Sequence, residues 1–162
     1  KFIKKNTSLL DLGSCPGGWS QVASKIIISG KILSIDIKQM ESIKNVKFIK
    51  SDIFEQSTKD QIFNFFNGDL DVIISDMAAD TTGSKSLDSI RTNLLSSEIL
   101  IFSSKILKPK GVLVSKVFMG DDFLEVKNLA KSLFKEIHFF KPNSSRDQSK
   151  ETYLHCKNLK SL

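Results

Sequence analysis

The chain has 162 residues, enough for one domain with a buried core. Its content of 40% hydrophobic and 26% charged residues is ordinary for a globular domain and excludes a disordered or fibrous chain. The net charge of +6 favours an anionic partner, and two cysteines are too few for a disulfide framework. This cysteine usage fits a reducing compartment, so we expect a cytoplasmic protein. No apolar run approaches the roughly 18 residues of a membrane span, so no contact with a membrane is expected.

Strand-like and helix-like segments alternate along the chain. Strands are expected at residues 8–13, 31–36, 46–52, 70–76, 111–118, 136–141 and 151–156. Helices are expected at residues 17–29, 58–67, 87–107 and 122–134. This order predicts a single α/β domain over residues 1–162, with a mostly parallel central sheet and helices on both faces.

A glycine-rich turn follows the first expected strand and leads into the first expected helix. Its sequence is Asp11-Leu12-Gly13-Ser14-Cys15-Pro16-Gly17-Gly18-Trp19-Ser20-Gln21. Glycine lets the backbone approach a ligand closely, and the start of a helix offers free N–H donors, so the turn predicts a site for an adenine nucleotide-type cofactor. The spacing differs from G-x-G-x-x-G, which counts against the alternative of a nicotinamide-dependent oxidoreductase.

The run D-x-G-x-x-P-G-G-W-S-Q resembles the cofactor loop of the FtsJ/RrmJ family of RNA ribose 2′-O-methyltransferases, which use S-adenosylmethionine. Further blocks follow in the family's order: Ser75-Asp76-Met77-Ala78, Ser115-Lys116-Val117-Phe118 and Ser149-Lys150-Glu151-Thr152-Tyr153. The resemblance covers nearly the whole chain. It implies a Rossmann-like methyltransferase fold and S-adenosylmethionine as the cofactor.

Three aspartates close three successive expected strands: Asp36, Asp52 and Asp76. Ligands of open α/β sheets lie at the carboxyl ends of the strands, where Asp36 can accept hydrogen bonds from ribose hydroxyls and Asp52 can reach the adenine amino group. A lone aspartate is as typical of a helix N-cap or a turn, but three in register favour a ligand site. The resemblance assigns cofactor binding to Gly17, Trp19, Asp36, Asp52 and Asp76, although Trp19 fits a core position equally well.

The resemblance also implies that Asp76, Lys116 and Glu151 are the last three members of the family's Lys-Asp-Lys-Glu catalytic tetrad. A ribose 2′-OH must lose its proton as it attacks the sulfonium methyl group, and a neutral Lys116 can accept that proton as general base. Free lysine has a pKa of about 10.4, so this role requires a pKa lower by roughly 3 units. Asp76 and Glu151 favour the ammonium form, and we expect them to orient Lys116 and the ribose.

Two features depart from the family pattern. The first lysine of the tetrad lies farther upstream than this chain extends, so the domain is expected to lack N-terminal residues, to bind the cofactor and to transfer methyl groups slowly without them. Ala79 stands where the family usually has a proline after Ser-Asp-Met-Ala, so we expect a more mobile loop there.

Lysines and an arginine are expected to flank the site: Lys1, Lys4, Lys5, Lys141, Arg146 and Lys150. They favour structured RNA as the substrate. The Pro-Gly-Gly-Trp-Ser-Gln loop looks more like the ribosomal branch of the family, which implies a uridine ribose in large-subunit ribosomal RNA and a monomer that acts on the large subunit. A tRNA methyltransferase and a non-catalytic RNA-binding or ribosome-assembly module remain the alternatives. The acids lie singly and apart from the two histidines, so no metal site is expected.

Overall fold

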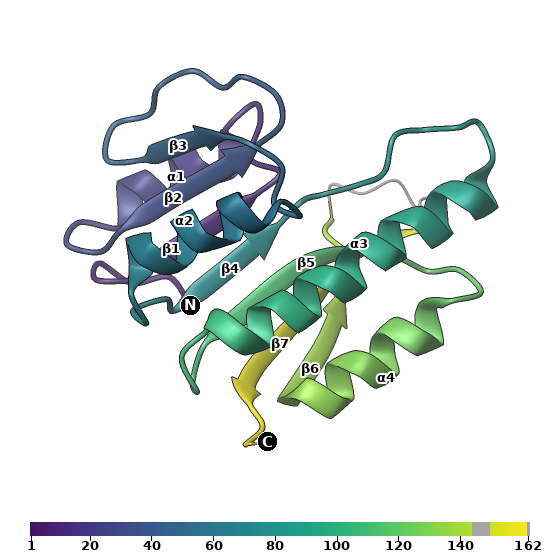
Figure 1. Cartoon of the computed structure of the whole chain (residues 1–162). Coiled ribbons are helices and arrows are strands. Elements are labelled where there is room, and N and C mark those ends of the chain that lie inside the picture. Colours follow the sequence, from purple (N-terminus) through teal and green to yellow (C-terminus); the bar gives the residue numbers. More distant parts are fainter. Residues whose placement is uncertain (144–149, 162) are drawn as a thin grey trace.

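A computed structural model describes residues 1–143 and 150–161 (Figure 1). Its sheet contains β1 (Leu9–Leu12), β2 (Ile32–Asp36), β3 (Lys47–Lys50), β4 (Val72–Ser75), β5 (Val112–Phe118), β6 (Phe134–Phe140) and β7 (Glu151–Leu159). The helices of these residues are α1 (Gly18–Ile26), α2 (Gln56–Phe66), α3 (Lys85–Ile106) and α4 (Phe123–Leu133). None of them is both long and apolar enough to cross a membrane.

The seven-stranded sheet has the order β3-β2-β1-β4-β5-β7-β6. The strands β1 to β5 run parallel, whereas β7 is antiparallel to both of its neighbours, β5 and β6. The mostly parallel sheet is therefore confirmed. The chain builds outward from β1 to β3 and then returns to place β4 on the other side of β1. In open α/β sheets such a reversal creates the ligand cleft, here between the carboxyl ends of β1 and β4.

Helices cover both faces of the sheet, as the sequence predicts. α1 closes one face, where Ala23 and Ile27 pack with Leu9, Ile32 and Val72. α2, α3 and α4 lie on the opposite face (Figure 1), with a larger core that includes Ile62, Phe66, Ile99, Leu100 and Val126. Because β1 and β4 are covered on both sides, their residues form continuous buried runs instead of alternating with polar ones.

The elements differ from the predicted ones mainly at their ends. α3 begins earlier than expected because the Ser84 side chain accepts a hydrogen bond from the N–H of Leu87 and caps the helix. β6 begins directly after α4, and β7 continues to Leu159 because Phe134 and Leu159 still pair across the two strands. The hairpin of β6 and β7 is therefore longer than the apolar pattern of either segment indicates.

Candidate active site

A cleft of about 660 Å³ opens at the carboxyl ends of the central strands. The three predicted strand-end acids, Asp36, Asp52 and Asp76, all line it, together with Gly13 of the glycine turn. They meet because parallel strands present their carboxyl ends at one edge of the sheet. The cleft therefore lies where the sequence predicts a cofactor.

Gly13 and Gly17 shape the turn between β1 and α1. Gly13 has a φ of 70°, and a Cβ at this position would lie 2.8 Å from Cγ of Met77, so glycine is required for the turn to approach the segment after β4. Gly17 has a φ of 117° and forms the N-cap of α1. It is buried beneath Met40 and Ile43 and does not line the cleft, so its effect on a cofactor acts through the backbone of the turn.

Asp36 and Asp52 are turn acids as well as cleft residues. Asp36 accepts hydrogen bonds from the N–H groups of Cys15, at 2.9 Å, and Lys38, at 2.8 Å, and so joins the glycine turn to the end of β2. Asp52 accepts a hydrogen bond from the N–H of Phe54 at 2.9 Å. Since each carboxylate oxygen has two lone pairs, both side chains keep acceptor capacity that faces the cleft.

Asp11 is a buried acid in β1, just before the glycine turn, that the sequence analysis did not single out. Its Oδ2 accepts a hydrogen bond from Ser20 at 2.5 Å, and Ser20 in turn lies 2.7 Å from the hydroxyl of Ser34. Burial, with a smaller contribution from Asp76 and Asp36, raises the pKa of Asp11 to about 6 against the opposing effect of the Ser20 hydrogen bond. Inward-facing Ser20 and Ser34, within otherwise apolar segments, are the sequence signal for this network.

Two buried polar atoms near Gly13 test whether the turn fits a cofactor. Within the described residues, Oδ1 of Asp11 and the hydroxyl of Ser14 make no hydrogen bond. Buried polar groups are normally paired, so these two atoms keep hydrogen-bonding capacity on the buried side of the turn. Neither residue lines the cleft, whereas Asp36, Asp52 and Asp76 do, so the carboxylates at the strand ends are the acceptors that fit the hydroxyl and amino donors of such a cofactor.

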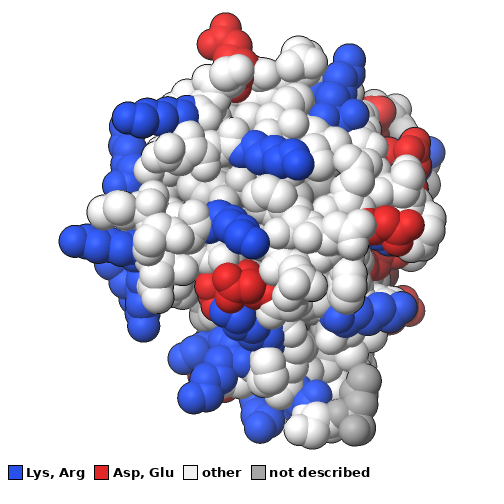
Figure 2. All heavy atoms as spheres, turned by 60° about the vertical axis from the view of Figure 1, so that its left-hand side comes forward, with Lys and Arg blue, Asp and Glu red and all other residues white. Residues whose placement is uncertain are grey.

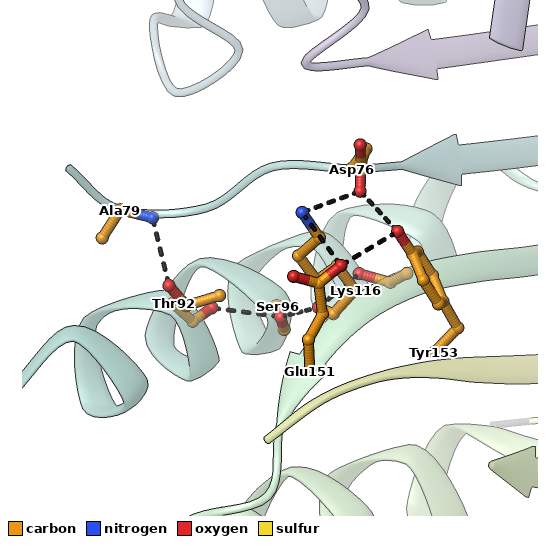
Figure 3. Close-up of polar contacts among 8 residues, drawn as sticks. Asp76, Ala79, Thr92, Ser96, Lys116, Glu151 and Tyr153 are labelled. Carbon is orange, nitrogen blue, oxygen red and sulfur yellow. Dashed lines mark hydrogen bonds and ion pairs between the residues drawn. The ribbon is translucent and has the colours of Figure 1, made fainter. Parts of the chain in front are cut away.

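Lys116 lies between two carboxylates (Figure 3). Its Nζ is 2.9 Å from Oδ1 of Asp76 and 3.5 Å from Oε1 of Glu151, and the lysine side chain is only 12% exposed. The register of the sheet explains this contact: Ser75 pairs with Ser115, which places Asp76 beside Lys116, while Glu151 starts the neighbouring strand β7. The structure thus brings together the three residues that resemble the catalytic tetrad.

Tyr153 is a further member of this cluster that the sequence analysis missed. It pairs with Lys116 across β5 and β7, and its hydroxyl donates to Oδ1 of Asp76 at 2.8 Å, with Oε1 of Glu151 at 3.4 Å. Burial raises the pKa of Tyr153 above its usual range, and the hydrogen bond to Asp76 raises it further. Tyr153 is therefore a stable hydrogen-bond donor and not a base near neutral pH.

Trp19 lies beside this cluster and not in the cleft. Its ring packs at a tilt against Tyr153, with 5.6 Å between the ring centroids, and it joins the apolar core on the α1 face. Cofactor binding by Trp19 remains a prediction, and the observed contact is to the Tyr153 ring.

A polar face of α3 fixes the strand ends that carry the site (Figure 3). Ser96 donates a hydrogen bond to the carbonyl of Lys116 at 2.6 Å. The Asn93 side chain donates to the carbonyl of Phe118 and accepts from its N–H. Thr92 accepts a hydrogen bond from the N–H of Ala79 at 3.1 Å. A proline at position 79 has no N–H to donate, so Ala79 gains an anchor at the start of the loop that was expected to be more mobile.

The predicted basic flank is only partly near the cleft. The carbonyl of Lys5 accepts hydrogen bonds from Ile28 and Ser29, beyond the carboxyl end of α1 and just before β2. Residues that precede a parallel strand lie at its amino end, so Lys4 and Lys5 are at the edge opposite the cleft, which corrects the expectation that they flank it. Lys141 and Lys150 are exposed beside the ends of β6 and β7, whereas Arg146 lies outside the described residues.

Within residues 1–143 and 150–161, no cluster of three or more His, Cys, Asp or Glu side chains is arranged to hold a metal ion. The candidate site is therefore described by the cleft, its acids and the cluster around Lys116.

Comparison with known proteins decides the family. The family model described as FtsJ-like methyltransferase matches residues 1–159. The chain belongs to the FtsJ-like methyltransferase family. The prediction of a methyltransferase is thereby confirmed, and the alternative of an oxidoreductase is set aside.

Relatives of this FtsJ-like methyltransferase carry a consistent description. This chain is 44% identical over 160 residues to Ribosomal RNA large subunit methyltransferase E of Pelagibacter ubique (strain HTCC1062). The match covers 99% of this chain and 79% of that protein. It is 43% identical over 166 residues to the protein of the same name from Rickettsia akari (strain Hartford), covering 99% of this chain and 73% of the relative.

Solved structures support the Rossmann-like methyltransferase fold. A Plasmodium falciparum protein described as a ribosomal RNA methyltransferase matches with a TM-score of 0.84 and 30% identity, over 98% of this chain and 89% of that one. Human methyltransferase-like protein 13, solved in complex with SAH, matches with a TM-score of 0.68 and 18% identity, over 94% and 72% of the two chains. At that identity the second match shows the fold alone.

Proposed function

We propose that this chain transfers a methyl group from S-adenosylmethionine to a ribose 2′-OH, that of a uridine, in large-subunit ribosomal RNA. The main support for the proposal is that Asp76 belongs both to the cleft and to the cluster around Lys116. Its side chain lines the cleft, and the same carboxylate contacts Lys116 and Tyr153. Asp76 therefore joins a cofactor site to a proton acceptor, which are the two parts that methyl transfer to a hydroxyl requires.

The cleft residues have the chemistry to hold S-adenosylmethionine. Asp36 suits the ribose hydroxyls and Asp52 suits the adenine amino group, and both line the cleft. When bound, the cofactor would supply an electrophilic methyl group on a sulfonium, and the bond between sulfur and methyl would break to leave a neutral thioether. Gly17 shapes the backbone of the turn, and Trp19 packs against the ring of Tyr153, so both act on the site indirectly.

Lys116 is the proposed general base. The ribose oxygen gains the methyl group and loses its proton, which Lys116 Nζ accepts, so the lysine must be neutral before the step and is an ammonium after it. Asp76 and Glu151 hold Nζ in place and stabilise the ammonium that forms. Because they also stabilise the ammonium before reaction, a second nearby cation or exclusion of water by bound RNA must favour the neutral lysine.

Surface charge and the relatives support ribosomal RNA as the substrate. The face turned forward in Figure 2 shows more Lys and Arg than Asp and Glu side chains. Exposed lysines lie in or next to β2 and β3: Lys31, Lys38, Lys44, Lys47 and Lys50. Such a surface attracts phosphate groups without reading base sequence. The curated relatives are named for the large-subunit RNA. The proposal also assigns the chain to the cytoplasm as a monomer.

The test is transfer of labelled methyl groups from S-adenosylmethionine to large ribosomal subunits that lack their 2′-O-methyl groups. Nuclease digestion and nucleoside chromatography then identify the product, and we expect the label in 2′-O-methyluridine. Label on a base would contradict ribose chemistry. Label in tRNA and not in the subunits would move the substrate to tRNA, and RNA binding with no transfer would favour a non-catalytic module.

A further inference from the structure

Four side-chain positions form a row across the sheet beside the cleft. Lys116 pairs with Tyr153, and Tyr153 pairs with Phe140 on the edge strand β6. Asp76 stands on the other side of Lys116. Paired residues of neighbouring strands point to the same face, so the row runs from the cleft through the proposed base to Phe140.

Phe140 ends this row with an open aromatic surface. Its ring is stacked on Tyr153, with centroids 5.7 Å apart and planes inclined by 22°, and the side chain is 45% exposed. Tyr153 itself is only 8% exposed and is held by Asp76. The carbonyl of Phe140 accepts a hydrogen bond from Thr152 at 2.8 Å, which fixes the strand at this point. Phe140 is thus a supported aromatic ring with one side towards solvent.

The position of Phe140 separates it from the cofactor cleft. The cleft lies between the ends of β1, β2 and β4, and Phe140 does not line it. Two strand spacings, or about 10 Å, separate the backbone of Phe140 from that of Lys116. A base next to a ribose positioned at Lys116 can bridge this separation. An RNA strand that presents its 2′-OH to Lys116 can therefore place a neighbouring base on the Phe140 ring.

We propose that Phe140 is a stacking site for a nucleobase of the substrate RNA adjacent to the methylated ribose. The inference rests on the proposed function, because it places RNA at Lys116. Proteins that recognise unpaired RNA commonly stack splayed bases on exposed aromatic side chains of a sheet. Phe140 supplies the flat apolar surface, while exposed Lys141 next to it suits the backbone phosphates.

Variants of Phe140 test the proposal in two assays. The first measures methyl transfer to undermethylated large subunits at varied subunit concentration, which separates KM from kcat. The second measures binding of a fluorescein-labelled single-stranded oligouridine without any methyl transfer. We compare Phe140→Ala, Phe140→Leu, which keeps apolar volume over Tyr153 but has no aromatic face, and Phe140→Trp. Phe63→Ala is the matched control, since Phe63 is 57% exposed but lies on α2 at the opposite face.

The proposal predicts that Phe140→Ala and Phe140→Leu raise KM and weaken oligouridine binding by about five- to a hundredfold, the usual range for loss of a base stack. Phe140→Trp should bind like the parent protein, and Phe63→Ala should change neither quantity. Affinity for S-adenosylmethionine should stay constant in every variant, which also shows that each is folded. Unchanged oligouridine binding and KM in Phe140→Leu would overturn the proposal. Absence of methyl transfer by the parent protein would instead overturn the proposed function, while the binding assay still decides the role of Phe140.

Discussion

Tyr153 donates a hydrogen bond to the carboxylate that links the cleft to Lys116. Tyr153→Phe removes this hydroxyl but keeps the ring that packs against Trp19 and Phe140. A hydrogen bond to a charged group contributes about 1.5–3 kcal/mol, so we expect kcat to fall by about ten- to a hundredfold while the protein still folds. Single-turnover methyl transfer at saturating cofactor measures the effect. An unchanged rate would show that Asp76 needs no orientation by Tyr153.

Asp11 makes stability depend on pH. Its pKa of about 6 in the folded protein lies above the ordinary value of 3.8, so the folded state binds more protons than the unfolded state between these values. The contribution of Asp11 to the free energy of unfolding is therefore complete below pH 4. It is lost as the pH rises through 6, and the total loss is about 3 kcal/mol.

Asp11→Asn resembles the protonated acid at every pH. We expect the free energy of unfolding of this variant minus that of the parent protein to increase between pH 4 and pH 7, because the parent loses stability over this range and the variant does not. Urea denaturation at several pH values measures this difference. Any constant cost of the new amide leaves the trend unchanged, whereas a difference that does not vary with pH would contradict the raised pKa.

At the scale of elements, α3 positions the ends of β4 and β5. Ser96 on this helix contacts the carbonyl of Lys116, and we expect Ser96→Ala to lower kcat by about fivefold, as loss of roughly 1 kcal/mol of positioning predicts. Affinity for S-adenosylmethionine should not change, because Ser96 does not line the cleft. The control is Ser104→Ala, a half-buried serine of the same helix whose hydroxyl donates to the carbonyl of Ile101 within α3. Equal effects of the two variants would exclude a specific role for Ser96.

The sequence predicts the strand ends well and the strand order less well. Asp36, Asp52 and Asp76 were placed correctly at one edge because alternation of strands and helices implies a parallel sheet, and parallel strands end together. No pattern in the sequence of β7 indicates that this strand inserts between β5 and β6. This insertion nevertheless places Tyr153 beside Lys116. Buried polar residues such as Asp11 and Ser96 look like surface positions until the fold supplies their partners.

At the scale of the whole molecule, the excess of positive charge is carried almost entirely by lysine, since Arg91 and Arg146 are the only arginines. Lysine attracts phosphate as a mobile point charge and reads little base sequence. Binding of RNA should therefore weaken by about tenfold or more between 50 and 200 mM salt, as displacement of counterions from a few phosphates predicts. Filter binding measures this dependence. An affinity that salt leaves unchanged would contradict recognition through the basic surface.

The central claim is that Lys116 accepts the proton of the methylated ribose, and Lys116→Ala tests it most directly. Single-turnover methyl transfer to undermethylated large subunits and the dissociation constant for S-adenosylmethionine should be measured on the same preparation. The account predicts that transfer falls at least about a thousandfold while cofactor affinity stays within about threefold, because Lys116 lies beside the cleft and does not line it. Transfer by Lys116→Ala at a rate close to that of the parent protein would contradict the account.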